Sequence, residues 1–194
     1  MPHRSSLPVA AVLAIGLCAL PASARAGEAT DQIRVDIEQL YGAVREAPAA
    51  NADREAAPVL DAMFDWSRMA ETALGGHWRA RSPAEREEFT KLFAGLFRRA
   101  YVSRIHLVDA SSFQYLGDSV AGGRTIVKTR ITTKKGSPLG VDYVTRLGAG
   151  QRWRVEDVRV EGISLMDNYR TQFDSIITRS SYAALVDRLR GGGK

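Results

Sequence analysis

The stretch from Trp153 to Phe173 constrains the fold most, because it places a strand and a helix on either side of one short bend. Apolar and charged side chains alternate over residues 153–160, which predicts a β-strand with one buried face. The alternation changes phase at Glu156–Asp157, which predicts a β-bulge. After Gly162, apolar side chains return at Ile163, Leu165, Tyr169 and Phe173. We therefore expect a sheet face and a helix to enclose a common apolar space.

The rest of the chain places helices before and after a run of strands. Helical spacing of apolar residues predicts helices over 30–47, 55–63, 69–74, 83–106, 169–178 and 182–189. Alternating spacing predicts strands around 113–115, 125–131, 139–147 and 152–161. Because the links between these strands are short, we expect a twisted, four-stranded antiparallel meander. The predicted fold class is α+β, with the helices packed on one sheet face.

The helix over 83–106 carries the clearest local signals. Ser82 and Glu85 have the spacing of a capping box, and Pro83 occupies the first helical position. Its apolar stripe is wide and aromatic, and consists of Phe89, Leu92, Phe93, Leu96, Phe97, Ala100, Tyr101 and Ile105. Most stripes of this kind are core, so the stripe alone does not distinguish a packed core from a ligand cavity.

Residues 1–26 have the three parts of a secretory signal peptide. A basic start is followed by an apolar run over 7–20 and by small residues that end at Ala26. We expect cleavage near Ala26, with Ala24 as the alternative, leaving a single domain over 27–194. The apolar run is too short to favour a membrane-spanning helix, although an uncleaved anchor is the competing interpretation.

Composition excludes several classes of function for the processed chain. The only cysteine, Cys18, lies in the predicted leader, so no disulfide, thiolate metal site or cysteine nucleophile would remain. The full sequence has 27 basic and 22 acidic residues, and removal of Arg4 and Arg25 leaves 25 against 22. A net charge of +3 is too small to indicate nucleic-acid binding.

Candidate catalytic residues do not form a recognisable set. His77, beside Trp78, fits a structural histidine at a helix end better than a general base. Glu156 and Asp157 are neighbours in a strand and face opposite sides unless a bulge intervenes, so we expect solvated carboxylates opposite arginines. No spacing of metal ligands is visible. We expect neither a catalytic nor a metal site. The alternative is a small enzyme with an acid–base pair drawn from Asp142, Asp157 and His77.

Two runs of residues, taken together, resemble a known family. The first run is Phe64, Asp65, Met69, Ala73, Leu74, Gly75, His77, Trp78, Ser82, Pro83, Glu85, Arg86 and Phe89. The second is Trp153, Val155, Asp157, Val158, Glu161, Gly162, Ile163, Ser164, Leu165, Asn168, Tyr169, Arg170, Gln172 and Phe173. In this order, and with a meander between them, they resemble the MlaC type of periplasmic phospholipid-binding protein. That family is also called the toluene-tolerance or lipid ABC transporter auxiliary component family. The resemblance covers residues 30–190.

The resemblance implies a fold and a cargo. It implies a twisted antiparallel sheet, similar to nuclear-transport-factor-2-like sheets, with helices that enclose a deep apolar pocket. Phospholipid acyl chains would lie in that pocket as cargo, with the headgroup near its mouth and no cofactor. Motif position and periodicity together predict the lipid-binding residues Met69, Ala73, Phe93, Phe97, Tyr101, Val141, Tyr143, Val158, Ile163, Leu165, Tyr169 and Phe173. A related branch of the family is associated with hopanoid lipids, which the sequence does not distinguish.

The resemblance also implies partners and a location. A monomeric periplasmic carrier would shuttle lipid between an outer-membrane lipoprotein–porin complex and an inner-membrane ABC complex with an MCE-domain ring. Arg98, Arg99 and Arg104 either form a solvated helix face or steer the carrier to anionic headgroups and acidic partners. A scaffold with a solid core is the remaining alternative, because a filled core would produce the same apolar pattern.

Overall fold

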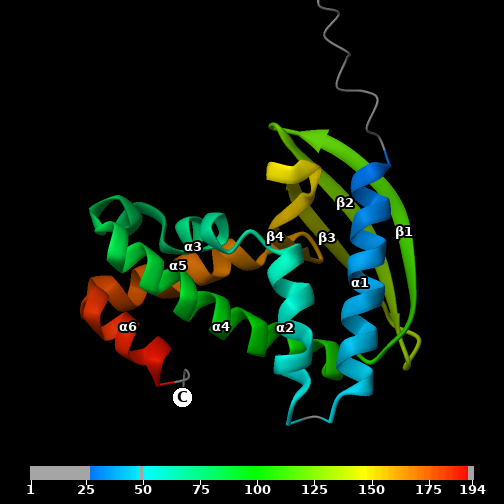
Figure 1. The fold of residues 1–194 in the computed structure, drawn as a ribbon, viewed down its shortest axis with the longest axis horizontal. Helices are drawn as coiled ribbons and strands as arrows, with labels where there is room; N and C mark the ends of the chain where they lie inside the picture. The colour runs from blue at the N-terminus through cyan, green and yellow to red at the C-terminus, as the bar shows by residue number, and fades with distance from the viewer. Residues whose placement is uncertain (1–26, 49, 192–194) are drawn as a thin grey trace, which may run out of the picture.

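The structure, a computed structural model, describes residues 27–48 and 50–191 (Figure 1). The predicted signal peptide lies outside the described residues. The helices are α1 (Glu28–Glu46), α2 (Ala52–Met63), α3 (Trp66–Leu74), α4 (Pro83–Val108), α5 (Leu165–Arg179) and α6 (Tyr182–Arg190). The strands are β1 (Ala110–Ala121), β2 (Arg124–Thr133), β3 (Pro138–Leu147), β4 (Trp153–Val160) and β5 (Ile163–Ser164). Two 3₁₀ helices, η2 (Gly75–Ala80) and η3 (Ala149–Gln151), complete the described elements.

The sheet is antiparallel throughout and has the order β1-β2-β3-β4-β5. The predicted α+β class is confirmed, but the predicted count of four strands was wrong by one. The additional strand, β5, is only two residues long and pairs Ile163 with Val160 across the turn at Glu161 and Gly162. Both turn residues have positive φ, 50° and 78°. Two residues are too few to show an alternating pattern, so the sequence assigned them to the bend before the helix.

The predicted bulge in β4 is confirmed. The register shifts between Val144 and Thr145 of β3, which face Asp157 and Val155 of β4. Glu156 is therefore the extra residue, and the side chains that follow it change face. The shift keeps Val155 and Val158 both buried, at 0% and 1% exposure.

Helix α4 begins and ends with well-defined caps. Glu85 N–H donates to Ser82 Oγ (3.2 Å) and Ser82 N–H donates to Glu85 Oε2 (2.7 Å), which confirms the predicted capping box. The helix runs two residues beyond its predicted end, to Val108, and stops where Asp109 adopts a left-handed conformation.

Helix α5 begins four residues earlier than expected, at Leu165. Ser164 Oγ accepts from Asp167 N–H (3.0 Å), and Asp157 Oδ1 accepts from Met166 N–H (3.1 Å). These two acceptors satisfy free N–H groups of the first turn, one of them from a neighbouring strand. The tertiary contact with Asp157 was not visible in the sequence, which explains the late predicted start.

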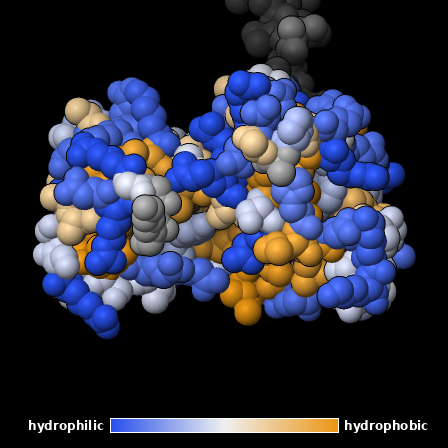
Figure 2. Space-filling model, turned by 90° about the horizontal axis from the view of Figure 1, so that it is seen from below, coloured by the Kyte–Doolittle hydropathy of each residue, from blue (hydrophilic) through white to orange (hydrophobic). Residues whose placement is uncertain are grey.

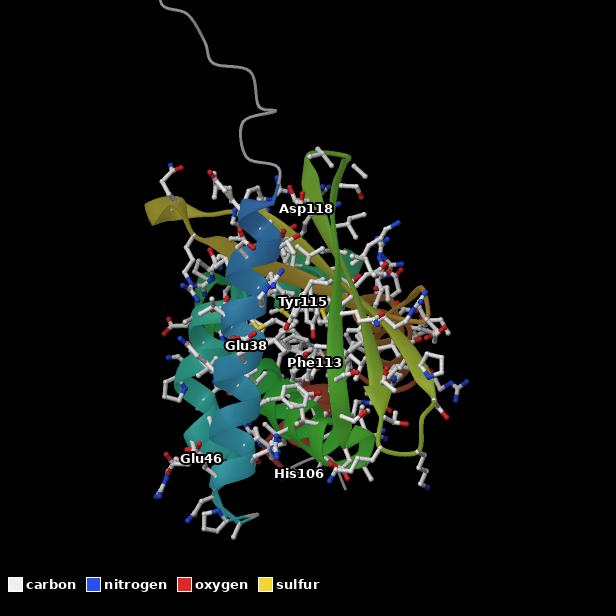
Figure 3. The ribbon with its side chains drawn as sticks, turned by 90° about the vertical axis from the view of Figure 1, so that its right-hand side faces the viewer. Glu38, Glu46, His106, Phe113, Tyr115 and Asp118 are labelled. Atoms are coloured by element: carbon white, nitrogen blue, oxygen red, sulfur yellow. The ribbon has the colours of Figure 1, made fainter. Side chains whose placement is uncertain are left out.

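Figure 1 shows two groups of elements joined by α4. Helices α1 and α2 lie with the sheet on one side, helices α3, α5 and α6 lie on the other, and α4 crosses both. Helix α1 runs alongside β1, and Phe113 and Tyr115 of β1 lie next to it (Figure 3). The rings of Tyr41 and Phe113 meet edge to face with centroids 4.6 Å apart. Asp118 of β1 accepts hydrogen bonds from Gly27 N–H (3.2 Å) and the Thr30 hydroxyl (2.8 Å), which holds the start of α1 to the sheet.

The core is most aromatic where α4 meets α5. Phe89 and Phe93 of α4 are fully buried and contact Phe173 of α5, with ring centroids 5.8 and 6.1 Å apart. Phe93 also meets Tyr169 edge to face at 5.4 Å. Among the described residues, no helix combines the length and the apolar character that crossing a membrane would require.

Candidate functional site

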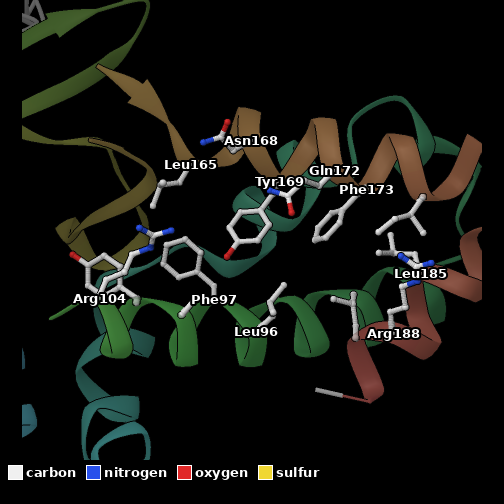
Figure 4. Close-up of a pocket in the computed structure, with 14 residues that line it drawn as sticks. Leu96, Phe97, Arg104, Leu165, Asn168, Tyr169, Gln172, Phe173, Leu185 and Arg188 are labelled. Carbon is white, nitrogen blue, oxygen red and sulfur yellow. The ribbon is translucent and has the colours of Figure 1, made fainter. Parts of the chain in front are cut away.

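A first cleft lies between α4 and α5 and is closed at one end by α6 (Figure 4). Its volume is about 450 Å³, within the range of small-molecule sites. Its lining mixes apolar and polar side chains and consists of Leu96, Phe97, Ala100, Tyr101, Arg104, Leu165, Asn168, Tyr169, Gln172, Phe173, Ile176, Leu185, Arg188 and Leu189. The cleft can therefore accept an apolar chain, with Arg104 at one end, Arg188 at the other, and the amides of Asn168 and Gln172 on α5.

A second cleft lies between the last turns of α4 and the concave sheet face. Its volume is about 150 Å³, and Tyr41 of α1 closes one side. The lining residues are Tyr41, Tyr101, Arg104, Ile105, Leu107, Val108, Ile131, Leu139, Val141, Tyr143, Val158, Val160 and Leu165. One of them, Leu107, is 80% exposed. Seen from below, an apolar area interrupts the otherwise polar surface of the protein (Figure 2).

The two clefts adjoin. Tyr101, Arg104 and Leu165 line both of them. Tyr101 and Arg104 are one helical turn apart on α4, and Leu165 opens α5 opposite them. The two clefts therefore meet at these three side chains, which we call the branch point.

Local structure explains why these residues meet. On α5, Leu165, Tyr169 and Phe173 recur every four residues and so share one face. On the sheet, Tyr143 pairs with Val158, and Val141 pairs with Val160. Because side chains at alternate positions of a strand share a face, these four residues form one apolar surface. The bend at Gly162 between β4 and α5 brings the helix face and the sheet face to the same branch point.

The tyrosines at the branch point stay neutral. The hydroxyls of Tyr101 and Tyr143 lie 3.1 Å apart and share a hydrogen bond. Burial raises the pKa of Tyr101 to about 12 and raises the pKa of Tyr143 well above its usual value. Burial also raises the pKa of Tyr169, although the nearby Arg104 opposes that shift. These hydroxyls can bind a polar group of a ligand, but they are poor bases.

Eight of the twelve residues predicted to bind lipid line one cleft or the other. They are Phe97, Tyr101, Val141, Tyr143, Val158, Leu165, Tyr169 and Phe173. The other four lie elsewhere. Met69, Ala73 and Phe93 have 0% exposure and belong to the packed core, and Ile163 is 60% exposed on β5. These four residues line neither cleft, and their contact with lipid stays a prediction.

Helical periodicity explains why three of these residues lie in the packed core. It assigned Met69, Ala73 and Phe93 correctly to inward faces, but it does not show whether the inward side is filled. Ile163 was counted with the apolar surface after Gly162. Its pairing with Val160 in β5 instead leaves it exposed.

The sequence analysis missed several residues of the site. It placed Leu185 and Leu189 on an ordinary apolar helix face, and nothing in their spacing connected them to α4. Asn168 and Gln172 belonged to the family motif but were not assigned to the lining. Arg104 was predicted either to form a solvated helix face or to steer the carrier to anionic headgroups and acidic partners, but it was not assigned to the lining of a cleft. Its neighbour Arg98 is not free for steering: it pairs with Asp61 at 3.5 Å and lies over the Trp66 ring.

The candidate acid–base residues have separate partners. His77 Nε2 lies 2.8 Å from Asp174 Oδ1, whereas Asp157 accepts from the first turn of α5. Burial raises the pKa of Asp157. Asp142 alternates with Val141 and Tyr143 on β3 and so faces away from the cleft. Within residues 27–48 and 50–191, no group of three or more His, Cys, Asp or Glu side chains is arranged to hold a metal ion.

Glu156, the bulged residue of β4, was expected to be solvated, but the structure shows that it is buried. It is 6% exposed and pairs with Arg146 (2.6 Å), Arg124 (3.0 Å) and Arg68 (3.3 Å). Burial alone would raise its pKa, but hydrogen bonds from Arg146 and Arg124 lower it overall. This cluster ties α3 to three strands of the sheet and has no side chain in either cleft.

Comparison with known proteins finds a matching family and a solved structure of similar fold. The family described as MlaC protein matches the chain over residues 31–191. A solved structure, described as the phospholipid-binding protein from Ralstonia solanacearum in complex with a phospholipid, has a similar fold. The TM-score is 0.72 at 20% sequence identity, and the match covers 85% of this chain and 96% of that chain. At this identity, the likeness shows a shared fold.

Proposed function

The chain belongs to the MlaC family, and we propose that it is a carrier that binds phospholipid acyl chains in the two adjoining clefts. One observation carries this proposal: two clefts with apolar side chains in their linings adjoin at the polar side chains of Tyr101 and Arg104. This shape matches a molecule with two apolar chains and one polar head. The phospholipid bound to the Ralstonia solanacearum protein of similar fold supports the same cargo.

Binding energies explain why a carrier of this kind needs partners. Transfer of acyl chains out of water gains roughly 0.8 kcal/mol per CH₂, on the order of 20 kcal/mol gross for a two-chain lipid. Spontaneous release into water would therefore be very slow. Exchange requires a partner that offers another apolar site. We propose the partners that the family resemblance implies: an inner-membrane MCE-domain ABC complex and an outer-membrane lipoprotein–porin complex. The carrier acts as a monomer between them and performs no covalent chemistry.

Delivery to the periplasm would follow from the signal peptide proposed for residues 1–26, and the structure of α1 supports cleavage after Ala26. The main-chain nitrogen of Gly27 lies 3.2 Å from Asp118 Oδ2. Cleavage after Ala26 would convert this amide into an ammonium group beside a carboxylate, which strengthens the contact. Intact mass measurement of the exported protein tests this. A mature chain that begins at Gly27 is expected, and a chain that retains residues 1–26 would contradict the proposal.

Detergent-free purification tests the cargo directly. The exported protein is expressed, purified without detergent and extracted with organic solvent, and the extract is analysed by mass spectrometry. About one phospholipid per protein is expected, with uptake of labelled phospholipid from vesicles by the delipidated protein. Hopanoids in the extract would redirect the proposal to the related branch of the family. An extract without lipid, combined with no uptake from vesicles, would overturn it.

A further inference from the structure

Arg104 occupies the branch point of the two clefts. Within residues 27–48 and 50–191, it is the only charged residue that lines both of them. Figure 4 shows it at one end of the first cleft, near Leu165 and Phe97, while Arg188 lies at the opposite end. Neither cleft is lined by an acidic side chain among the residues that the structure describes. The charge on the lining is therefore entirely positive.

Arg104 also differs from Arg98, which lies on the same helix and has partners within the protein. Arg98 is held by Asp61 and by the Trp66 ring. No carboxylate in the described part of the chain pairs with Arg104, and its side chain is exposed. Arg104 and Tyr169 both line the first cleft, and the nearby guanidinium opposes the rise that burial causes in the pKa of Tyr169. A guanidinium beside an apolar cleft, without an internal counter-ion, is suited to an anionic group of a ligand.

The geometry of a phospholipid selects Arg104 over Arg188. The two acyl chains diverge at the glycerol, directly next to the phosphate. A lipid with one chain in each cleft must therefore place its phosphate where the clefts meet, which is at Arg104. Arg188 lines only the first cleft, beside Leu185 and Leu189, where the end of an acyl chain would lie. Asn168 lies on the α5 side of the first cleft and offers an amide donor to the same headgroup.

We infer that Arg104 is the anchor for the lipid phosphate, with one acyl chain in each cleft, so that the protein selects two-chain lipids with an anionic phosphodiester. This inference rests on the proposed carrier function. The longer part of one chain fills the cleft of about 450 Å³. The other chain enters the cleft of about 150 Å³ and extends to its exposed apolar rim at Leu107. A fully neutral lipid of the same chain length gains the apolar burial but not the contact with Arg104.

A comparison of two lipids separates the contribution of the contact between Arg104 and the phosphate from that of acyl-chain burial in the clefts. Delipidated protein is loaded from vesicles that contain either labelled dioleoylphosphatidylglycerol or labelled dioleoylglycerol, which lacks the phosphate. Arg104→Gln is expected to reduce loading of phosphatidylglycerol roughly tenfold, the weight of one charge-assisted contact. Loading of dioleoylglycerol should be unchanged. The matched control, Arg99→Gln, removes the same charge from the same helix outside both clefts and should change neither.

Each other result overturns the assignment in a distinct way. Equal loss of both lipids in Arg104→Gln would mean that Arg104 only shapes the cleft. Equal loss of phosphatidylglycerol in Arg99→Gln would mean that surface charge as a whole attracts the lipid. Loss in Arg188→Gln but not in Arg104→Gln would place the phosphate at the other end. If the unmodified protein takes up both lipids and Arg104→Gln loses neither, only the anchor fails. If the unmodified protein takes up neither lipid, the carrier function fails as well.

The forked placement has its own test. Leu139 is half-buried and lines only the second cleft, so Leu139→Trp should block that branch. Loading of two-chain phosphatidylglycerol should fall several-fold, while loading of single-chain lysophosphatidylglycerol should persist in the first cleft. Leu116→Trp, at an exposed position on β1 away from both clefts, serves as the control for a new tryptophan. Loss of both lipids, or of neither, in folded Leu139→Trp would rule out one chain in each cleft.

Discussion

The apolar stripe of α4 is packed into the core along the first half of the helix and lines the two clefts along the second half. In the first half, Phe89 and Phe93 are fully buried against the rings of Tyr169 and Phe173. In the second half, Tyr101 lines both clefts. Phe97 stands at the boundary: it is 2% exposed, contacts the Phe64 ring and also lines the first cleft. One amphipathic helix can therefore be core along one part of its length and line a cleft along the next.

The difference comes from what lies opposite the helix. Opposite the first half, α5 places two aromatic rings in contact with the stripe. Opposite the second half, α5 has not yet begun. Its first residue is Leu165, and the residues before it lie in the sheet and in the turn at Gly162. The gap between helix end and sheet face is the branch point. A site of this kind requires no special residue type, because it is made by the missing packing partner.

The largest expected effect tests the packed half of α4. Phe93→Ala removes a fully buried ring from a cluster of four aromatic contacts and should lower the free energy of unfolding by about 3–5 kcal/mol. Leu96→Ala, one turn on and facing the first cleft, should cost much less because little packing is lost. Urea unfolding at equilibrium measures both. Equal losses would mean that the two halves are packed alike.

The next prediction concerns the charged cluster of buried Glu156 with Arg68, Arg124 and Arg146, which lies outside both clefts. Glu156→Gln leaves Arg124 and Arg146 without their buried carboxylate and should lower the free energy of unfolding at pH 7 by about 2 kcal/mol. The pKa of Glu156 is lower in the folded state than in an unfolded chain. Its stabilisation is therefore complete above the ordinary carboxyl pKa and is lost as pH falls through the lowered value.

Unfolding curves over a pH series measure this dependence. The difference between Glu156→Gln and the unmodified protein should shrink in acid. The control is Glu87→Gln, which removes an exposed carboxylate that pairs with Lys91 and should leave unfolding nearly unchanged. A difference that stays constant down to strongly acidic pH would show that the ion pairs do not carry the effect.

A third prediction concerns the open half of α4. Leu165→Trp places a larger side chain at the branch point of both clefts and should reduce co-purifying phospholipid several-fold. Because the new ring enters open space, the free energy of unfolding should change by only about 1 kcal/mol. Ile163→Trp is two residues away on exposed β5 and should retain full lipid content. The readout is phospholipid per protein by mass spectrometry. Loss of lipid in Ile163→Trp would indicate that Ile163 contacts the lipid after all.

The smallest expected effect concerns the hydroxyl pair in the open half. Tyr101→Phe and Tyr143→Phe each leave one buried hydroxyl without its partner and should each cost about 1 kcal/mol. The double variant should cost less than either single one, because no unpaired hydroxyl remains. A double-mutant cycle measures this coupling. Strict additivity of the two single losses would show that the hydroxyls do not depend on each other.

Much of this protein is determined by local sequence patterns. The capping box of Ser82 and Glu85, the aromatic stripe of α4, and the bulge at Glu156 all follow from interactions between residues close in the chain. The motif over residues 153–173 carries both the family resemblance and the apolar helix face that reaches the cleft. Eight of the predicted lining residues lie in the clefts because periodicity selects inward faces reliably.

Only the tertiary structure decided which inward faces are filled. Phe93 and Tyr101 have the same place in the pattern, yet Phe93 is fully buried against α5, whereas Tyr101 lines both clefts. Arg98 and Arg104 are equally basic in sequence, yet one is held by Asp61 and the other stands at the branch point. The physical reason is that periodicity reports the direction of a side chain. Whether the side chain finds packing, a counter-ion or a cleft depends on elements far away in the chain.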